Sequence, residues 1–153
     1  MTTSTSLKER LRADLTTAIK GRDELRMSTL RMALAAVGTE EVAGAVAREL
    51  SDDEILKVLT REVKKRQEAA TAFAGAGRAG QADRERAEGD VLREYLPAQL
   101  SDDELQALVA DAIAQTGASG AKAMGQVMKV LTPKTAGRAD GGRVAAAVKS
   151  ALG

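Results

Sequence analysis

The sequence predicts an all-α protein in which an N-terminal lobe of about four long helices, residues 1–96, precedes a small C-terminal lobe of three helices, residues 97–153. Ala, Leu, Glu, Arg and Lys dominate, and no stretch alternates β-branched or aromatic with polar residues over the length of a strand. Sequences typical of helix N-caps occur where apolar residues begin to repeat at helical spacing. Pro97 interrupts the pattern and marks the boundary between the lobes.

The first helix is expected to begin after Ser6, with Glu9 completing a capping box, and to end at Gly21. Four apolar residues recur at every fourth position and predict one buried stripe: Leu7, Leu11, Leu15 and Ile19. A polar segment, 1–6, precedes this helix.

A second helix is expected to start near Asp23 and to bury one apolar face. That face consists of Met27, Leu30, Leu34 and Val37. The helical pattern continues more weakly toward Leu50, because Gly38 and Gly44 lower its propensity.

The third helix opens with the capping box Ser51–Glu54 and presents Ile55, Leu59, Val63 and Phe73 on one face. The small residues of 74–80 predict a turn. A fourth helix, about 81–95, interleaves charges of both signs and ends in an apolar group that must pack on another element.

The C-terminal lobe repeats the capping box at Ser101–Glu104 and ends its first helix at Gly117. A short helix beginning near Met124 is expected to stop before Pro133. Asp140 is suited to cap the last helix, whose inward residues are expected to be Val144, Val148, Ala151 and Leu152. Helices of about 12 residues are marginal alone, so these three must pack together.

The composition excludes several classes of chemistry. The chain has no Cys and no His, which removes thiolate nucleophiles, Cys/His zinc sites and imidazole bases. Phe73 and Tyr95 are the only aromatic residues, too few for a base-stacking platform. No apolar run has the length of a membrane span. We therefore expect a cytoplasmic protein without cofactor, metal site or membrane contact.

Two glycine-rich segments and two acidic triplets resemble functional motifs only superficially. Residues 75–80 match G-x-G-x-x-G, but a helix precedes them where dinucleotide binding needs a strand. Residues 120–125 have the glycine spacing of a P-loop, but Gln126 replaces its lysine. The triplets 52–54 and 102–104 suit the positive ends of helix dipoles better than a metal. We find no catalytic constellation and expect no enzyme activity.

The charge distribution is more informative. Residues 1–96 hold 17 basic and 17 acidic side chains, whereas residues 112–153 hold six basic side chains and a single acidic one, Asp140. We expect these six cations to share one surface. Such a basic region is typical of a polyanion partner, although a solvated surface would give the same pattern.

Several motifs resemble those of the YqeY family. They are Glu94-Tyr95-Leu96-Pro97, Gln99-Leu100-Ser101, Met124-Gly125 with Val127-Met128-Lys129, Pro133-Lys134, and Gly137-Arg138-Ala139-Asp140-Gly141. Leu30-Arg31-Met32 and the helix start at Ser51 fit the same pattern, and the resemblance runs from about Leu7 to Leu152. Between Val37 and Arg48 the chain departs from it, with glycines and alanines where family members commonly carry basic residues.

The resemblance implies an accessory role. The family is similar to the C-terminal tail of the GatB chain of the Asp/Glu-tRNA amidotransferase, a helical appendage that helps to hold tRNA. It implies tRNA or other structured RNA as partner, held by Lys129, Lys134, Arg138 and the amides of Gly141 and Gly142. Close helix packing is the alternative explanation for Gly125 and Gly141.

The complete set of candidate nucleic-acid-binding residues is Lys122, Lys129, Lys134, Arg138, Gly141, Gly142, Arg143 and Lys149. A second hypothesis is a helical adapter that docks an aminoacyl-tRNA synthetase or amidotransferase through the charge-dense helices 51–76 and 81–95. A third is glutamine-dependent carbon–nitrogen ligase activity, inherited as a family label.

Overall fold

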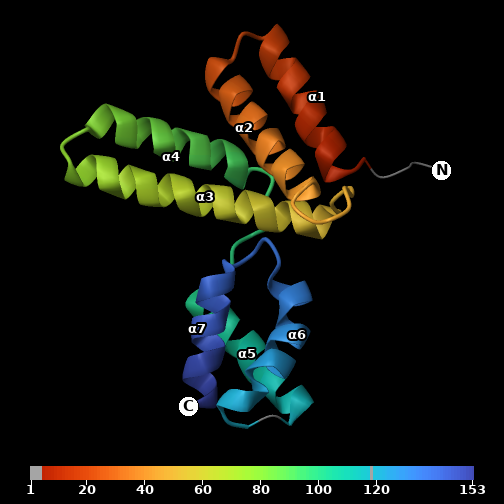
Figure 1. The fold of residues 1–153 in the computed structure, drawn as a ribbon. Helices are drawn as coiled ribbons and strands as arrows, with labels where there is room; N and C mark the ends of the chain where they lie inside the picture. The colour runs from red at the N-terminus through yellow and green to blue at the C-terminus, as the bar shows by residue number, and fades with distance from the viewer. Residues whose placement is uncertain (1–4, 118) are drawn as a thin grey trace. The chain divides into compact units, whose positions relative to one another are not determined.

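A computed structural model describes residues 5–117 and 119–153, and this part of the chain contains helices and no strand (Figure 1). The seven α-helices are α1 (Leu7–Lys20), α2 (Glu24–Glu41), α3 (Asp52–Gly75), α4 (Ala79–Arg93), α5 (Asp102–Thr116), α6 (Met124–Thr135) and α7 (Gly141–Leu152). A single 3₁₀ turn, η1 (Ala121–Ala123), precedes α6. The helices form two compact units, Met1–Leu96 and Pro97–Gly153.

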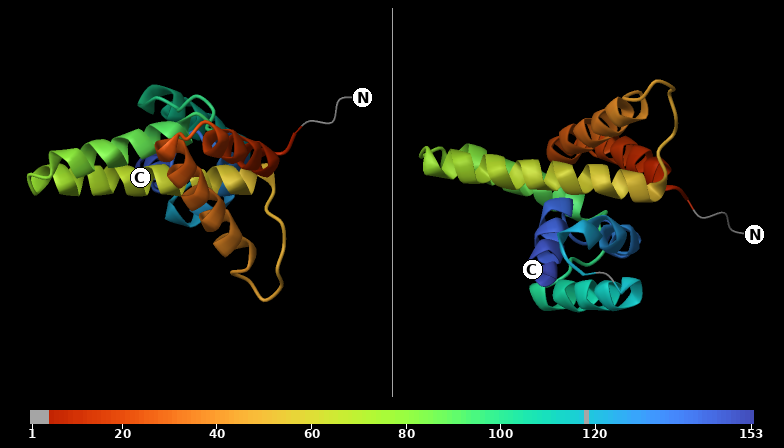
Figure 2. Two further views of the ribbon diagram at one scale, coloured as in Figure 1. Left: turned by 90° about the horizontal axis from the view of Figure 1, so that it is seen from above. Right: turned by 60° about the horizontal axis from the view of Figure 1, so that its bottom comes forward.

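The first unit consists of two antiparallel helix pairs. Helix α1 packs along α2, and α3 packs along α4 in a hairpin (Figures 1 and 2). The pairs meet through α2, which contacts both α3 and α4. Their shared core contains Leu7, Leu11, Leu30, Ala33, Val37, Leu50, Ile55, Val58, Leu59, Val63, Leu92 and Tyr95.

Helix α1 begins at the predicted residue, but of the expected capping box only the Ser6 half is seen in the described residues, and the buried stripe differs. Ser6 caps the helix by accepting a hydrogen bond from the Glu9 amide. Leu7 and Leu11 are buried, whereas Ile19 is exposed and Ala18 is buried in its place. A helix turns by about 100° per residue, so positions spaced by four drift about 40° at each step. The expectation that Ile19 is buried was therefore wrong.

Helix α2 ends earlier than its weak helical continuation predicts. It is capped by Asp23, whose carboxylate accepts from the Arg26 amide, and it ends at Glu41. The Glu41 carboxylate bonds the Leu50 amide, and its carbonyl accepts from the Arg48 amide. These bonds close residues 42–50 into a loop, with Gly44 within it.

The α3–α4 hairpin follows the sequence prediction closely. Both halves of the capping box between Ser51 and Glu54 are present. Helix α3 runs to Gly75, and Gly77 takes the left-handed conformation (φ 74°) in the turn before α4. The segment that matches G-x-G-x-x-G thus joins two helices, and Phe73 before it is only half-buried.

In the second unit α5, α6 and α7 pack against one another. The Ser101–Glu104 box caps α5, and Gly117 ends it in the left-handed conformation (φ 60°). Asp140 caps α7. The core contains Leu100, Leu105, Val109, Ala112, Val127, Leu131, Ala139, Val144 and Val148. Ala151, expected to face inward, is exposed.

The expected stop before Pro133 was wrong, because α6 continues through it to Thr135. Proline removes one backbone bond and clashes with the preceding turn. Here Leu131 and Thr135, on either side of the proline, are buried. The packing of the last turn therefore outweighs the local preference, and the helix ends two residues after the proline.

Candidate nucleic-acid interface

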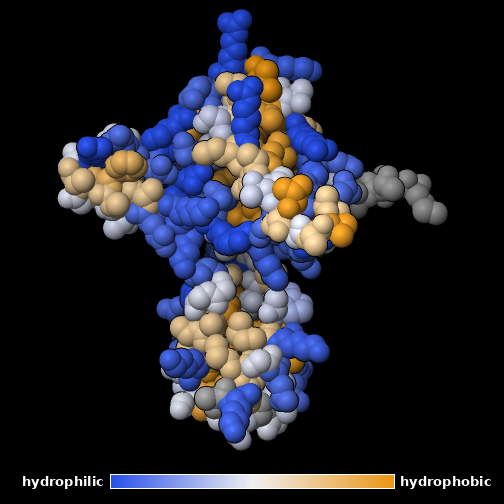
Figure 3. All heavy atoms as spheres, in the orientation of Figure 1, coloured by the Kyte–Doolittle hydropathy of each residue, from blue (hydrophilic) through white to orange (hydrophobic). Residues whose placement is uncertain are grey.

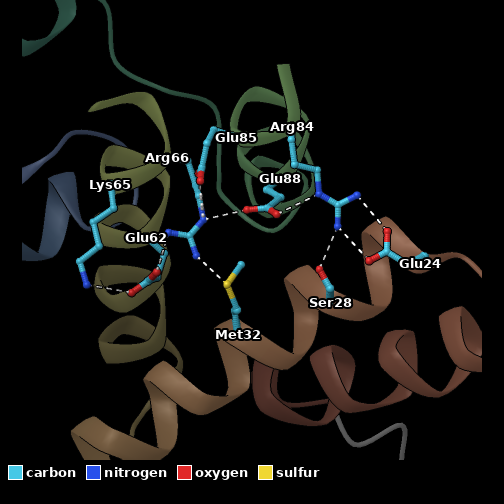
Figure 4. A network of polar contacts seen from close by, with 9 residues as sticks. All are labelled: Glu24, Ser28, Met32, Glu62, Lys65, Arg66, Arg84, Glu85 and Glu88. Atoms are coloured by element: carbon cyan, nitrogen blue, oxygen red, sulfur yellow. Dashed lines mark hydrogen bonds and ion pairs between the residues drawn. The ribbon is translucent and has the colours of Figure 1, made fainter. Parts of the chain in front are cut away.

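In the first unit many cations are neutralised by carboxylates from other helices (Figure 4). Arg66 of α3 lies 3.3 Å from Glu62 of its own helix and 3.3 Å from Glu88 of α4. Arg84 of α4 pairs with Glu88 and reaches Glu24 of α2 at 2.9 Å. This network joins three helices and leaves neither arginine free for an external anion.

Further ion pairs extend this neutralisation. Cations of α1, α2, α3 and the 42–50 loop pair with carboxylates in Lys8–Glu41, Arg26–Glu94, Arg48–Glu54 and Arg61–Glu40. These contacts have electrostatic consequences: the Lys8 ammonium lowers the pKa of Glu41, and the Arg26 guanidinium lowers the pKa of Glu94. More than half of the 17 basic side chains of residues 1–96 are therefore paired within the unit.

Both arginines of the candidate interface have intramolecular partners. Arg143 lies 2.7 Å from the carboxylate of Asp102, at the start of α5. Arg138 donates from Nε to the Ala98 carbonyl at 3.1 Å. Its charge also contributes slightly to the lowered pKa of Glu104, which results mainly from hydrogen bonds with Ser101. These arginines lie beside the acidic start of α5 and are poor first candidates for phosphate contacts.

The four lysines of the second unit behave differently. Lys122, Lys129, Lys134 and Lys149 are exposed. Within residues 5–117 and 119–153 no hydrogen bond or ion pair involves their ammonium groups. An exposed ammonium without a protein partner keeps its full charge available to an external anion. These four lysines are the strongest part of the candidate interface.

The lysines come from three elements: η1, α6 and α7. Lys129 and Lys134 are five positions apart on α6, which turns them about 140° from each other around the helix axis. Lys149 lies in the last turn of α7, next to the buried Val148. Helix α6 therefore presents its two lysines in different directions. The expectation that all six cations share one surface was wrong for this pair.

The glycines at the start of α7 form a helix N-terminus that is already partly occupied. The Asp140 carboxylate accepts from the Gly142 amide at 2.9 Å, so this amide is not free for a phosphate. A Cβ on Gly141 or on Gly125 would meet no atom within 4 Å. Close helix packing therefore does not explain either glycine.

Tyr95, the only tyrosine of the chain, has structural partners. Tyr95 is buried and donates its hydroxyl to Asp14, while Arg10 lies 4.7 Å from its ring centroid. Burial, with a further effect of Asp14, raises the pKa of Tyr95 above its ordinary value. In the part of the chain that the structure describes, no three acidic side chains gather as metal ligands would.

Sequence reasoning missed the pairing of Arg138 and Arg143. The partners Ala98 and Asp102 are 40 and 41 positions away, and no local pattern links them. A count over the whole of residues 97–153 contains the missing signal. This segment has six basic residues against Asp102, Asp103, Glu104, Asp111 and Asp140, a net charge of +1.

Comparison with known proteins assigns the family. A family model described as Yqey-like protein matches residues 8–152, nearly the whole chain. The chain belongs to the YqeY family. Among curated proteins no match was found for this YqeY-family chain. No helix within its described residues has the length and apolar character needed to cross a membrane.

Proposed function

We propose that this YqeY-family protein is a non-catalytic RNA-binding accessory protein that contacts phosphates through its C-terminal unit. The observation that carries the proposal is the set of partner-free lysines on η1, α6 and α7, namely Lys122, Lys129, Lys134 and Lys149. Ammonium groups spaced over a small helical unit suit a rigid backbone of phosphates better than a single small anion.

Structured RNA fits this arrangement better than single strands. The second unit holds no aromatic residue, so it has no surface on which unpaired bases would stack. The similarity of the family to the tRNA-holding tail of an amidotransferase makes tRNA the first RNA to test. Such binding follows shape and phosphate positions and has little sequence preference.

The test is tRNA affinity measured as a function of salt concentration. Four phosphate contacts predict that log K falls with log salt at a slope of about −3, since each contact contributes roughly 0.7–0.9. Replacing the four lysines with Gln should abolish most of that slope. Absence of binding near 50 mM salt, or a flat plot, would refute the proposal.

A matched control removes the same charge from the first unit. Arg12, Lys20, Arg31 and Lys57 are exposed, and no hydrogen bond or ion pair of the described residues involves their charged groups. Their fourfold Gln variant should keep the wild-type salt slope. An equal loss of slope in both variants would mean that binding follows total charge and is not located in the C-terminal unit.

The non-catalytic part of the proposal has its own assay. Incubation of the pure chain with glutamine, with and without tRNA, should release no ammonia above a buffer control. Release that persists through purification would make the chain an amidotransferase or hydrolase.

The adapter hypothesis receives little support from helices α3 and α4, on which it was based. Many of their charges pair with each other or with α2, as in Arg66–Glu88 and Arg84–Glu24. They are therefore already satisfied, and a protein partner would need another surface.

A further inference from the structure

The exposed hydrophobic residues of the chain are concentrated in one segment. In the described residues, the large apolar side chains that are exposed all fall within residues 19–46: Ile19, Met32, Val42 and Val46. Met32 contacts Arg66 of α3. The other three are 45%, 65% and 78% exposed and lie on α1 or in the loop that follows α2.

The exposed apolar residue of α1 lies to one side of the buried face of that helix. Leu11 is fully buried, and Leu15 and Ile19 are turned from it by about 40° and 80° in the same direction. Leu15 is half-buried and Ile19 is exposed. The apolar surface of α1 thus passes gradually from the core to the outside.

Helix α2 repeats this arrangement. Leu30 is fully buried, and Leu34 and Gly38 are turned from it by the same two angles. Leu34 is half-buried, and a Cβ at Gly38 would meet no atom within 4 Å. The space beside Gly38 is therefore open to a side chain of a partner.

The two surfaces meet along one seam. The ion pair of Lys8 with Glu41 joins α1 to α2. Around the helix axes, Lys8 is turned from the buried Leu11 toward the side of Leu15, and Glu41 is turned from the buried Leu30 toward the side of Leu34. Figure 3 shows hydrophobic atoms in a line over α1 and α2 and again over the 42–50 loop, on one face of the molecule. We call this surface, formed by Leu15, Ile19, Leu34, Gly38, Val42 and Val46, the outer seam.

Unpaired cations border the outer seam. Arg12 and Arg31 each follow a fully buried leucine by one position and are exposed, and their guanidinium groups make no hydrogen bond or ion pair within the described residues. Arg12 lies one helical turn after Lys8, whose ammonium pairs with Glu41 of α2. Lys20 and Arg22 lie at the turn between the two helices. The border is thus positive on both helices.

We propose that the outer seam docks an acidic amphipathic helix of a partner protein. An apolar stripe on that helix would cover Leu15, Ile19 and Leu34, and carboxylates beside the stripe would meet Arg12 and Arg31. An acidic helix satisfies both the apolar centre and the positive border. RNA would satisfy the arginines alone, because it offers no apolar stripe.

A second copy of this chain is a poorer occupant. A symmetric dimer places the same patch against itself, so Arg12 and Arg31 would face arginines of the other copy. A single helix with complementary charges needs less area for a reversible complex.

The test uses synthetic helical peptides of about 18 residues, the length of α2. The first peptide carries leucines at positions i, i+4, i+7 and i+11 with glutamates beside them. The second replaces the glutamates with lysines, and the third keeps the glutamates but replaces the leucines with serines. Binding to the full chain is measured by amide chemical shifts. The first peptide should shift α1, α2 and the 42–50 loop and bind at least about tenfold tighter than either other peptide.

Two variants locate the site. Ile19→Ser removes an exposed apolar contact and should weaken the first peptide severalfold without changing the melting temperature. The pair Arg12→Glu with Arg31→Glu should reverse the preference toward the lysine peptide. Shifts confined to the C-terminal unit, no binding at 1 mM, or an unchanged preference in the charge-reversed variant would overturn the proposal.

Other possible ligands of the outer seam would give different experimental results. A dimer in sedimentation that Ile19→Ser dissolves would assign the seam to a second copy and overturn the proposal. Protection of α1 and α2 by tRNA, or adsorption to phosphatidylserine vesicles that Ile19→Ser abolishes, would overturn it by assigning the seam to RNA or to a membrane surface. Because the proposed tRNA contacts depend on lysines of the other unit, either proposal can fail while the other stands.

Discussion

The two units of this protein use charge in opposite ways. In residues 1–96 at least nine of 17 basic side chains form ion pairs, often between helices. In residues 97–153 only Arg143 of six does so within the described residues. The net charges are 0 and +1, so net charge barely separates the units. What separates them is which charges the fold has already satisfied.

The difference teaches where to look for partners. An ion pair between helices stabilises a particular packing, and both of its charges are then unavailable to a binding partner. A lysine without a partner contributes little to folding and remains available for binding. The second unit therefore has the stronger case for a polyanion, while the first exposes its apolar residues along the outer seam.

The largest expected effect tests whether the two units have equivalent cores. Leu30 and Leu131 are both fully buried, so replacing either with Ala should cost about 2–5 kcal/mol of unfolding free energy. Urea unfolding followed by amide signals of each unit would measure this. The shorter C-terminal unit is expected to have the smaller free energy of unfolding, so the same loss should unfold a larger fraction of it. Ile19→Ala, at an exposed position, is the control and should change little.

A second effect sharpens the contrast between paired and unpaired cations. Arg66 is 13% exposed between Glu62 and Glu88, so Arg66→Ala leaves carboxylates poorly compensated and should cost about 2–4 kcal/mol. Arg84 is 40% exposed, and Arg84→Ala should cost about 1 kcal/mol or less. Thermal unfolding compares them. Arg66→Met separates charge from packing, and equal losses in the two Ala variants would contradict this ranking.

Two glycines, one in each unit, should respond in opposite directions. Gly117 ends α5 at φ 60°, and Ala there should cost about 1 kcal/mol, because a Cβ disfavours that conformation. Gly38 lies within α2 with open space beside it, and Ala should stabilise by up to about 1 kcal/mol. Melting temperatures of the two variants provide the measurement. A shift of the same sign in both would contradict this reading of the backbone.

The smallest effect compares the two copies of the capping box. Bonds from Arg48 and from the Ser51 amide lower the pKa of Glu54 from 4.5 to about 2, whereas Glu104 is held only by Ser101 and a weak effect of Arg138. A lowered carboxyl pKa gives stability that is complete above pH 4.5 and is lost as the pH falls toward 2. Glu54→Gln should flatten the stability profile in that range more than Glu104→Gln. Urea midpoints between pH 2 and 7 would show this, and equal flattening would contradict it.

Helix starts were predictable because their causes are local. Ser6, Asp23, Ser51, Ser101 and Asp140 each cap a helix within three residues of the group they bond. The family was equally accessible, because its motifs are short and retained along the chain. The candidate lysines were also found from sequence, since their charges are counted directly.

Properties that depend on a distant partner were not predictable. Ile19 and Ala18 are adjacent in the sequence, and only the packing of α1 against its neighbouring helices selects which of them is buried. Pro133 has a strong local preference that the packing of α6 overrides. The pairing of Arg138 and of Arg143 depends on residues 40 and 41 positions away.

By itself, the order of the residues determined that this chain forms capped helices in two lobes, without cysteine or histidine chemistry and with a positive excess near its end. Only the tertiary structure decided which arginines are satisfied, which lysines remain free and which apolar residues reach the surface. The physical reason is the distance along the chain over which each interaction acts. Capping and helix propensity act within one turn, whereas burial and ion pairing depend on which helices the fold brings together.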